Sequence, residues 1–282
     1  MEIKVDPRQL RRTLQAIVGG RNPFSGQLHL AAVEAFVEKE LASYGLTVES
    51  DYFVYRGKNF RNIVGGLGAR RGASLIILGA HLDSVEGTPG ADDNASGVAV
   101  LLESARLLSR ARLRAAVLFC AFNLEELNMI GSTHFARKLK SARAKVEGMI
   151  SLEMVGYTDS RVGSQNYPFG LKAFYPDRGD FIGVIGNWNS GSLLRRFARQ
   201  MRQVHGLGVE TLSVPGNGGL VPAVRLSDHS PFWDLGYPAL MITDTAFFRN
   251  PHYHSATDTV ETLDLNFMEK VCEGVVRAVL GL

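Results

Sequence analysis

Four clusters of histidine and carboxylate side chains each follow or close an apolar run of this sequence. They are HLD at 81–83, NLEE at 123–126, LEM at 152–154 and HYHS at 252–255, and GADDNASG at 90–97 adds two adjacent aspartates. Imidazoles and carboxylates bind transition metals, and they also transfer protons in hydrolytic reactions. These residue types therefore favour a metal site, acid–base chemistry, or both.

The adjacent aspartates Asp92 and Asp93 are the clearest indication of a metal. A turn before a helix favours Asp, Asn and Ser, and Asn94 or Ser96 would serve as the cap, but such a turn needs only one aspartate. Neighbouring carboxylates repel each other unless a cation neutralises them. The pair is better explained by a bound metal than by turn chemistry alone.

The other clusters are informative only as a set. His81 two residues before Asp83 is typical of an imidazole ligand beside the carboxylate that fixes its tautomer, although a core histidine and a turn aspartate would look the same. Glu125 and Glu126 follow a buried strand directly, so one carboxylate is expected to face a metal and its neighbour the metal-bound water. Glu153 lies at an apolar strand end, where an unpaired charge is costly.

Alternating apolar strands and amphipathic helices must position these clusters. The expected strands cover 46–57, 59–68, 73–80, 114–122, 148–154 and 237–243, and the expected helices cover 27–45, 95–109, 192–206 and 263–281. This alternation predicts an α/β three-layer sandwich with a central mixed, largely parallel sheet flanked by helices. Such sheets gather ligands at the carboxyl ends of their strands, so the clusters are expected to converge.

Composition excludes several classes of protein. The chain has 282 residues, 45% hydrophobic and 21% charged, with a formal net charge of +3 and two cysteines. We expect one catalytic domain over 1–282, with an irregular pocket-forming insertion at about 156–189 and a pocket loop at 213–222. Neither a nucleic-acid patch nor a membrane helix is expected. The cysteine count and the charged start favour a cytoplasmic protein, or a secreted one if a leader was removed.

The ordered set HLD, PGADDNASG, EE, LEM and YHSATDT resembles the bacterial leucyl aminopeptidase type of co-catalytic zinc exopeptidase, the twenty-eighth metallopeptidase family. The resemblance extends from RNPFSGQLH to ETLD. It implies a metallo-aminopeptidase that removes N-terminal residues from peptides through a metal-activated water. It also implies two Zn ions as cofactors, with Co or Mn as substitutes.

The resemblance further implies a role for individual residues. Asp92 would bridge the two metals, and the remaining ligands would be His81 and Glu153 for one ion and Glu126 and His254 for the other. Relatives usually have aspartate in place of Glu153. Glu125 would be the general base, and Tyr253 matches a tyrosine that some relatives use against the oxyanion. The expected supporting residues are Asp83, Asp93, Ser227 and Asp258. Relatives also carry a cis peptide between the two aspartates, which is expected here.

Three alternatives remain open at this point. A carboxypeptidase or dipeptidase would use the same metal centre and would need arginines for the substrate carboxylate, for which Arg225 and Arg249 are candidates. A glutaminyl cyclase would use one zinc, and a binding module would have lost its ligands. The complete ligand set favours peptide hydrolysis, and the local motifs favour an aminopeptidase.

Overall fold

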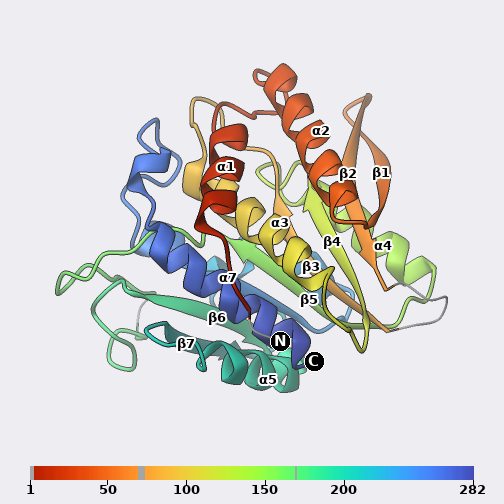
Figure 1. The fold of residues 1–282 in the computed structure, drawn as a ribbon. Helices are drawn as coiled ribbons and strands as arrows, with labels where there is room; N and C mark the ends of the chain where they lie inside the picture. The colour runs from red at the N-terminus through yellow and green to blue at the C-terminus, as the bar shows by residue number, and fades with distance from the viewer. Residues whose placement is uncertain (1–2, 69–73, 169) are drawn as a thin grey trace.

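The computed structural model describes residues 3–68, 74–168 and 170–282, which form one eight-stranded sheet between two layers of helices (Figure 1). Residues 73 and 169, which belong to the predicted strand 73–80 and the predicted insertion 156–189, lie outside the described residues. The strand order across the sheet is β1-β2-β4-β3-β5-β8-β6-β7. The strands are β1 (Thr47–Tyr55), β2 (Lys58–Leu67), β3 (Leu75–His81), β4 (Ala116–Phe122), β5 (Val146–Glu153), β6 (Phe181–Asn187), β7 (Gly208–Val214) and β8 (Ala239–Thr243).

The centre of the sheet is parallel and its flanks are mixed. Strands β4, β3, β5 and β8 run parallel to one another, whereas β2 is antiparallel to both β1 and β4. Strand β6 is antiparallel to β8 and parallel to β7. The predicted mixed, largely parallel sheet is confirmed.

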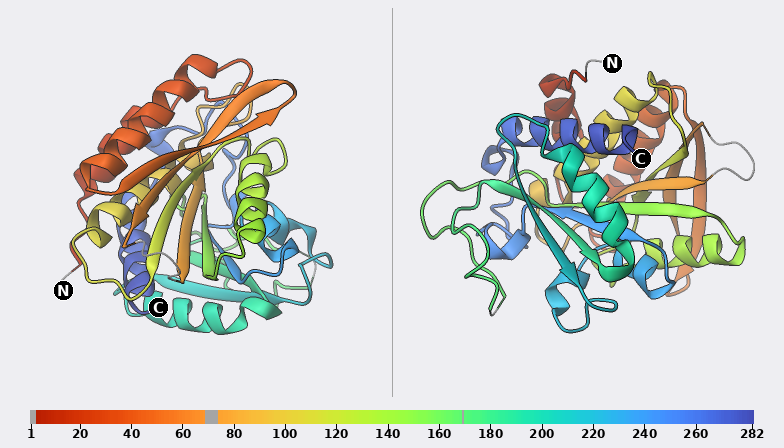
Figure 2. Two further views of the ribbon diagram at one scale, coloured as in Figure 1. Left: turned by 90° about the vertical axis from the view of Figure 1, so that its right-hand side faces the viewer. Right: turned by 90° about the horizontal axis from the view of Figure 1, so that it is seen from below.

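Helices cover both faces of this sheet (Figure 2). The helices of one face are α1 (Pro7–Ile17), α2 (Gln27–Ser43), α3 (Gly97–Leu108), α5 (Gly191–Met201) and α7 (Leu265–Leu280). The opposite face is covered by α4 (Ile130–Ser141) and α6 (Ser230–Asp234). The three predicted layers are therefore present.

Strand β3 shows how one sequence run serves two cores. Ile76 and Leu78 pack in the core under α3, while Ile77 between them packs in the core under α4 and α6. Side chains alternate between the faces of a strand, so a central strand covered on both sides reads as an uninterrupted apolar run. This is why LIILGA was recognisable as a buried strand.

The parallel register brings the strand ends to one edge of the sheet. His81 at the end of β3 pairs with Phe122 at the end of β4, and Glu153 at the end of β5 pairs with Thr243 at the end of β8. All four polar clusters start at this edge or just beyond it.

Several elements were not predicted. Strand β6 lies inside 156–189, which was expected to be irregular, and β7, α1 and α4 had no predicted counterpart. The β6 sequence FIGVIGN contains two glycines that interrupt its apolar pattern. In β7, GVETLSV, the polar residues hide the strand in a single-sequence reading. Within the described ranges, no helix has both the length and the apolar character needed to span a bilayer.

Candidate metal centre

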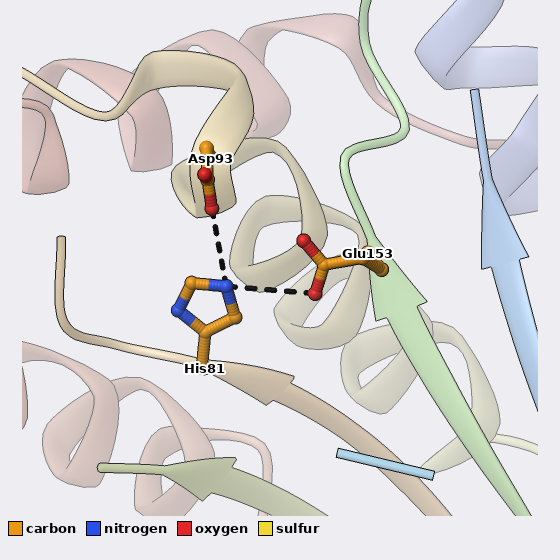
Figure 3. Close-up of side chains that lie close together, drawn as sticks. All are labelled: His81, Asp93 and Glu153. Atoms are coloured by element: carbon orange, nitrogen blue, oxygen red, sulfur yellow. Dashed lines mark ion pairs between the residues drawn. The ribbon is translucent and has the colours of Figure 1, made fainter. Parts of the chain in front are cut away.

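The first half of the site joins three buried side chains from three elements (Figure 3). His81 ends β3, Glu153 ends β5, and Asp93 lies in the turn that precedes α3. The His81 Nε2 atom is 3.2 Å from Asp93 Oδ1 and 3.5 Å from Glu153 Oε2. These three donor atoms lie close enough to share one cation.

The second half of the site uses the other oxygen of Asp93. His254 Nε2 is 3.1 Å from Asp93 Oδ2 and 3.3 Å from Glu126 Oε2. Asp93 therefore faces one histidine with each carboxylate oxygen, and it belongs to two of the three groups of possible ligands, the third being His81, Glu125 and Glu126.

Asp92 does not occupy the position expected for it. Its Oδ1 accepts a hydrogen bond from the Gly156 N–H at 2.9 Å, and its Oδ2 accepts one from Asn250 Nδ2 at 2.7 Å. Since consecutive side chains of this turn point to different sides, only Asp93 reaches the histidines. The structure thus places Asp93, and not the predicted Asp92, between the two histidines, and it places the cis peptide between Asp93 and Asn94 instead of between the two aspartates.

His81 is held with its Nε2 free to act as a donor to a metal. Its Nδ1 lies 3.1 Å from the main-chain oxygen of Asp83, which places the ring proton on Nδ1. The Nε2 atom is buried and has no hydrogen-bond partner among the described residues. Burial alone would lower the pKa of His81, but the carboxylates of Glu153 and Glu125 outweigh burial and raise that pKa well above its usual value.

The carboxylates around His81 crowd one another in a largely buried space. Burial raises the pKa of Glu125 well above its ordinary range, and burial together with the Asp93 charge raises the pKa of Glu126 to about 7. For Asp93, burial is outweighed by the neighbouring imidazoles of His254 and His81, so its pKa is lowered. Buried like charges with orphaned donor atoms, including Glu126 Oε1, fit a divalent cation.

Two of the expected supporting residues orient the carboxylates directly. Asp83 accepts the Glu125 N–H at 3.0 Å and the Glu126 N–H at 3.2 Å, so it fixes the start of the acidic pair. Ser227 donates to Glu153 Oε2 at 2.8 Å.

Asp258, another expected supporting residue, contacts the aspartate turn. Its carboxylate accepts the main-chain N–H groups of Asp92 at 2.8 Å and Asp93 at 3.1 Å. It therefore ties the loop that carries His254 to the aspartate turn.

A buried arginine that the sequence reasoning missed holds the same turn from behind. Arg21 donates to the carbonyl oxygens of Leu82 at 2.7 Å, Pro89 at 2.8 Å and Gly90 at 2.8 Å. Burial lowers the pKa of Arg21 to about 10. Gly90 has φ of 64°, and a Cβ there would lie 2.4 Å from the Asp93 carbonyl oxygen, so only glycine fits. Nothing in RNPFSG indicated these partners, because all three lie more than sixty residues away.

Tyr253 and the two candidate arginines, Arg225 and Arg249, each contact other residues of the protein. The Tyr253 ring stacks on the His254 ring with centroids 3.7 Å apart, and burial raises the pKa of its hydroxyl. Arg225 pairs with Asp234 at 2.8 Å. Arg249 donates to Gln165 and to the Phe181 carbonyl oxygen, each at 2.8 Å. Arg225 is thus paired within the protein, and Arg249 is bound through Nε and Nη1, while its buried Nη2 has no partner among the described residues.

A largely apolar cavity adjoins the centre, with Glu153 and Tyr253 in its wall. Side chains between 165 and 175 form another part of the wall, as expected for the segment 156–189. The loop 213–222 does not line the cavity. A Cβ on Gly218 would lie 2.9 Å from Val224 Cγ2, so this loop packs behind Val224, which does line it.

Comparison with known proteins agrees with this geometry. Residues 62–279 match the model of Peptidase family M28. Uncharacterized protein YfbL of Escherichia coli is 38% identical over 283 residues, covering 96% of this chain and 86% of that protein. A probable leucine aminopeptidase of Arthroderma benhamiae is 32% identical over 212 residues, covering 69% of this chain and 50% of that protein.

A solved structure shares the fold. BSAP, a zinc aminopeptidase from Bacillus subtilis, superposes with a TM-score of 0.76 at 16% identity, over 99% of this chain and 95% of its own. The predicted family and fold class are confirmed. The family also confirms the predicted peptidase activity. The chain belongs to peptidase family M28.

Proposed function

We propose that this chain is a zinc-dependent aminopeptidase that holds two metal ions, one on each side of Asp93. The observation that carries the proposal is the position of the Asp93 carboxylate, 3.2 Å from His81 Nε2 through one oxygen and 3.1 Å from His254 Nε2 through the other. A single ion would leave one of these nitrogen–carboxylate groups without a cation.

The ligands divide into two sets. His81 and Glu153 would hold one ion together with Asp93, and Glu126 and His254 would hold the other. Mixed imidazole and carboxylate ligands suit zinc, and cobalt or manganese can replace it in such sites. Zinc bound there would polarise the scissile carbonyl and lower the pKa of a bound water towards ~7.

Glu125 is the residue proposed to move the proton. Neither of the two ligand sets that share Asp93 includes Glu125. The Oε2 atom of Glu125 nevertheless lies 3.8 Å from His81 Nε2. Asp83 fixes its main-chain N–H, so the carboxylate is held at the edge of the centre. From there Glu125 takes a proton from the attacking water and passes it to the leaving amine.

The choice of an aminopeptidase over a carboxypeptidase follows from the cavity wall. No arginine or lysine occurs among the described residues that line the cavity, so a substrate carboxylate would find no cationic partner there. Relatives of this chain include a probable leucine aminopeptidase. Tyr253, which stacks on His254 and lines the cavity, would contact the substrate carbonyl.

Replacing Glu125 with Gln tests the proposal. The variant is expected to keep two zinc ions per chain by atomic absorption and to lose about 100- to 10,000-fold in kcat on leucine p-nitroanilide. The exposed Glu147→Gln in β5 is the matched control and should behave as wild type. Wild-type enzyme should leave N-acetyl-leucine p-nitroanilide intact. Equal cleavage of the blocked substrate, or full activity in Glu125→Gln, would contradict the proposal.

A further inference from the structure

A single row of residues crosses the sheet from the metal centre to the far strand. Glu153 of β5 pairs with Thr243 of β8, Thr243 pairs with Gly183 of β6, and Gly183 pairs with Glu210 of β7. Paired residues point to the same face of a sheet, so both carboxylates face the cavity side. Three inter-strand spacings separate their backbones by about 14 Å. Strands β6 and β7 lie side by side at the edge of the molecule in Figure 1.

The two residues in the middle of this row have small side chains or none, and the residues of the neighbouring row are apolar. Gly183 has no side chain and Thr243 has a short one, so the space between the two glutamates stays open. The adjacent row consists of Met241, Ile185 and Leu212, which also line the cavity. The result is an apolar trough that runs from Glu153 to Glu210.

Glu210 stands in this trough without a partner. It makes no hydrogen bond and no ion pair with the residues that the structure describes, and it is only partly buried. Besides Glu153, it is the one charged residue among the described residues of the wall. A carboxylate in an apolar wall is costly unless a cation joins it.

Two tyrosines frame the Glu210 end of the trough without satisfying its carboxylate. The rings of Tyr167 and Tyr175 stack with centroids 5.7 Å apart, and both line the cavity. The Tyr175 hydroxyl donates to the Thr211 carbonyl oxygen at 2.9 Å, and the Tyr167 hydroxyl donates to the Pro176 carbonyl oxygen. Because both protons are used elsewhere, the tyrosines leave the Glu210 carboxylate unneutralised, and aromatic rings also attract cations.

We propose that this trough receives the side chain of the substrate's N-terminal residue and that Glu210 selects lysine or arginine there. This inference rests on the aminopeptidase function proposed above, which places the N-terminal residue beside Glu153. Lysine and arginine lay an aliphatic stem along apolar surface and keep a charged head for a polar partner. Met241, Ile185 and Leu212 suit the stem, and Glu210 with the tyrosine rings suits the head.

The test compares substrates that differ mainly in the terminal cation. The kcat/KM values of lysine, arginine, norleucine, leucine and glutamate p-nitroanilides are measured on zinc-loaded wild type, Glu210→Gln and the exposed control Glu147→Gln. Norleucine has the lysine stem without the ammonium. The lysine-to-norleucine ratio should exceed one in wild type and in Glu147→Gln. In Glu210→Gln it should fall by about 10- to 100-fold, as expected for loss of a charged hydrogen bond.

Binding provides a readout that does not depend on turnover. Calorimetry with free lysine and norleucine, which contain no bond for the enzyme to cleave, on zinc-loaded protein should show tighter binding of lysine, and Glu210→Gln should abolish the difference. Thermal unfolding checks that the variant is folded. A wild-type preference for norleucine, or a lysine preference that survives in Glu210→Gln, would overturn the inference and leave the aminopeptidase intact. If no unblocked substrate is cleaved, the proposed function fails, and the calorimetry still decides the role of Glu210.

Discussion

At the scale of single residues, the structure gives Asp92 and Asp93 separate tasks. Asp93 faces both histidines, whereas Asp92 accepts hydrogen bonds from Gly156 and Asn250. Asp244 also lies against Asp92, and burial together with the Asp244 charge raises the pKa of Asp92 well above its usual range. Asp92 thus supports the turn, and Asp93 is the proposed ligand of both ions.

Replacing each aspartate with Asn should separate these tasks. Asp93→Asn is expected to weaken zinc binding by more than about 100-fold. Mutation of a residue that only supports a metal ligand already lowers metal affinity by about 10- to 100-fold. Asp92→Asn should keep its metal content, because an amide in its place can still accept from Gly156. Zinc titration monitored by calorimetry measures both variants. Loss of zinc in Asp92→Asn with retention in Asp93→Asn would restore the original prediction.

At the scale of elements, α6 and the residues beside it form a rigid support under the cavity wall. His229 precedes α6, its Nε2 lies 2.8 Å from the Val224 carbonyl oxygen, and its ring contacts the edge of Trp233 with centroids 4.4 Å apart. Burial lowers the pKa of His229 to about 3, so it stays neutral in the folded protein. Val224 is thereby held in place as part of the cavity wall.

This neutral histidine predicts a pH dependence of stability. An unfolded histidine takes up a proton near pH ~6.5, whereas folded His229 does so only near pH 3, so the unfolded chain binds more protons between these values. Below pH ~6 the free energy of unfolding should therefore fall by about 1.4 kcal/mol per pH unit through this group. His229→Gln should remove that contribution, whereas the exposed His205→Gln should retain it. Urea unfolding in the presence of a chelator measures the free energy of unfolding of these proteins between pH 5 and 7. Parallel curves of this free energy against pH for wild type and His229→Gln would refute the assignment of the pH dependence to His229.

At the scale of the whole molecule, the metal centre joins segments that are far apart in the chain. Its residues come from the end of β3, the turn before α3, the loop after β4, the end of β5 and the loop that follows β8. Without cations these segments bring buried carboxylates together, which opposes folding. Metal ions would therefore contribute to the stability of the whole sheet edge as well as to catalysis.

Zinc removal is expected to lower the melting temperature. Free zinc at about 1,000 times its dissociation constant would stabilise the folded state by about 4 kcal/mol, which corresponds to a shift of about 10 °C. Differential scanning calorimetry with zinc and with EDTA measures this shift. Asp93→Asn should show a much smaller one. Equal melting temperatures of wild type in zinc and in EDTA would argue against a structural role for the ions.

The sequence alone determined the central strands, the helices α2, α3, α5 and α7, and most of the residues at the site. Those features are local, because an apolar run or an amphipathic period is visible without knowing its partners, and strand ends in such sheets bear the chemistry. These patterns found the clusters that contain His81, Glu126, Glu153 and His254, the resemblance to the family selected these four residues, and the structure brings them together.

Only the tertiary structure decided which aspartate faces the histidines, what Arg21 holds and where Glu210 lies. Each depends on contacts between distant parts of the chain. For example, the Asp258 carboxylate that accepts the Asp92 N–H lies 166 residues away from it in the sequence. The row from Glu153 to Glu210 likewise exists only through the register of four strands, two of which were not predicted. Side-chain direction in a turn and register across a sheet are set by packing between segments, and no local pattern of residue types contains them.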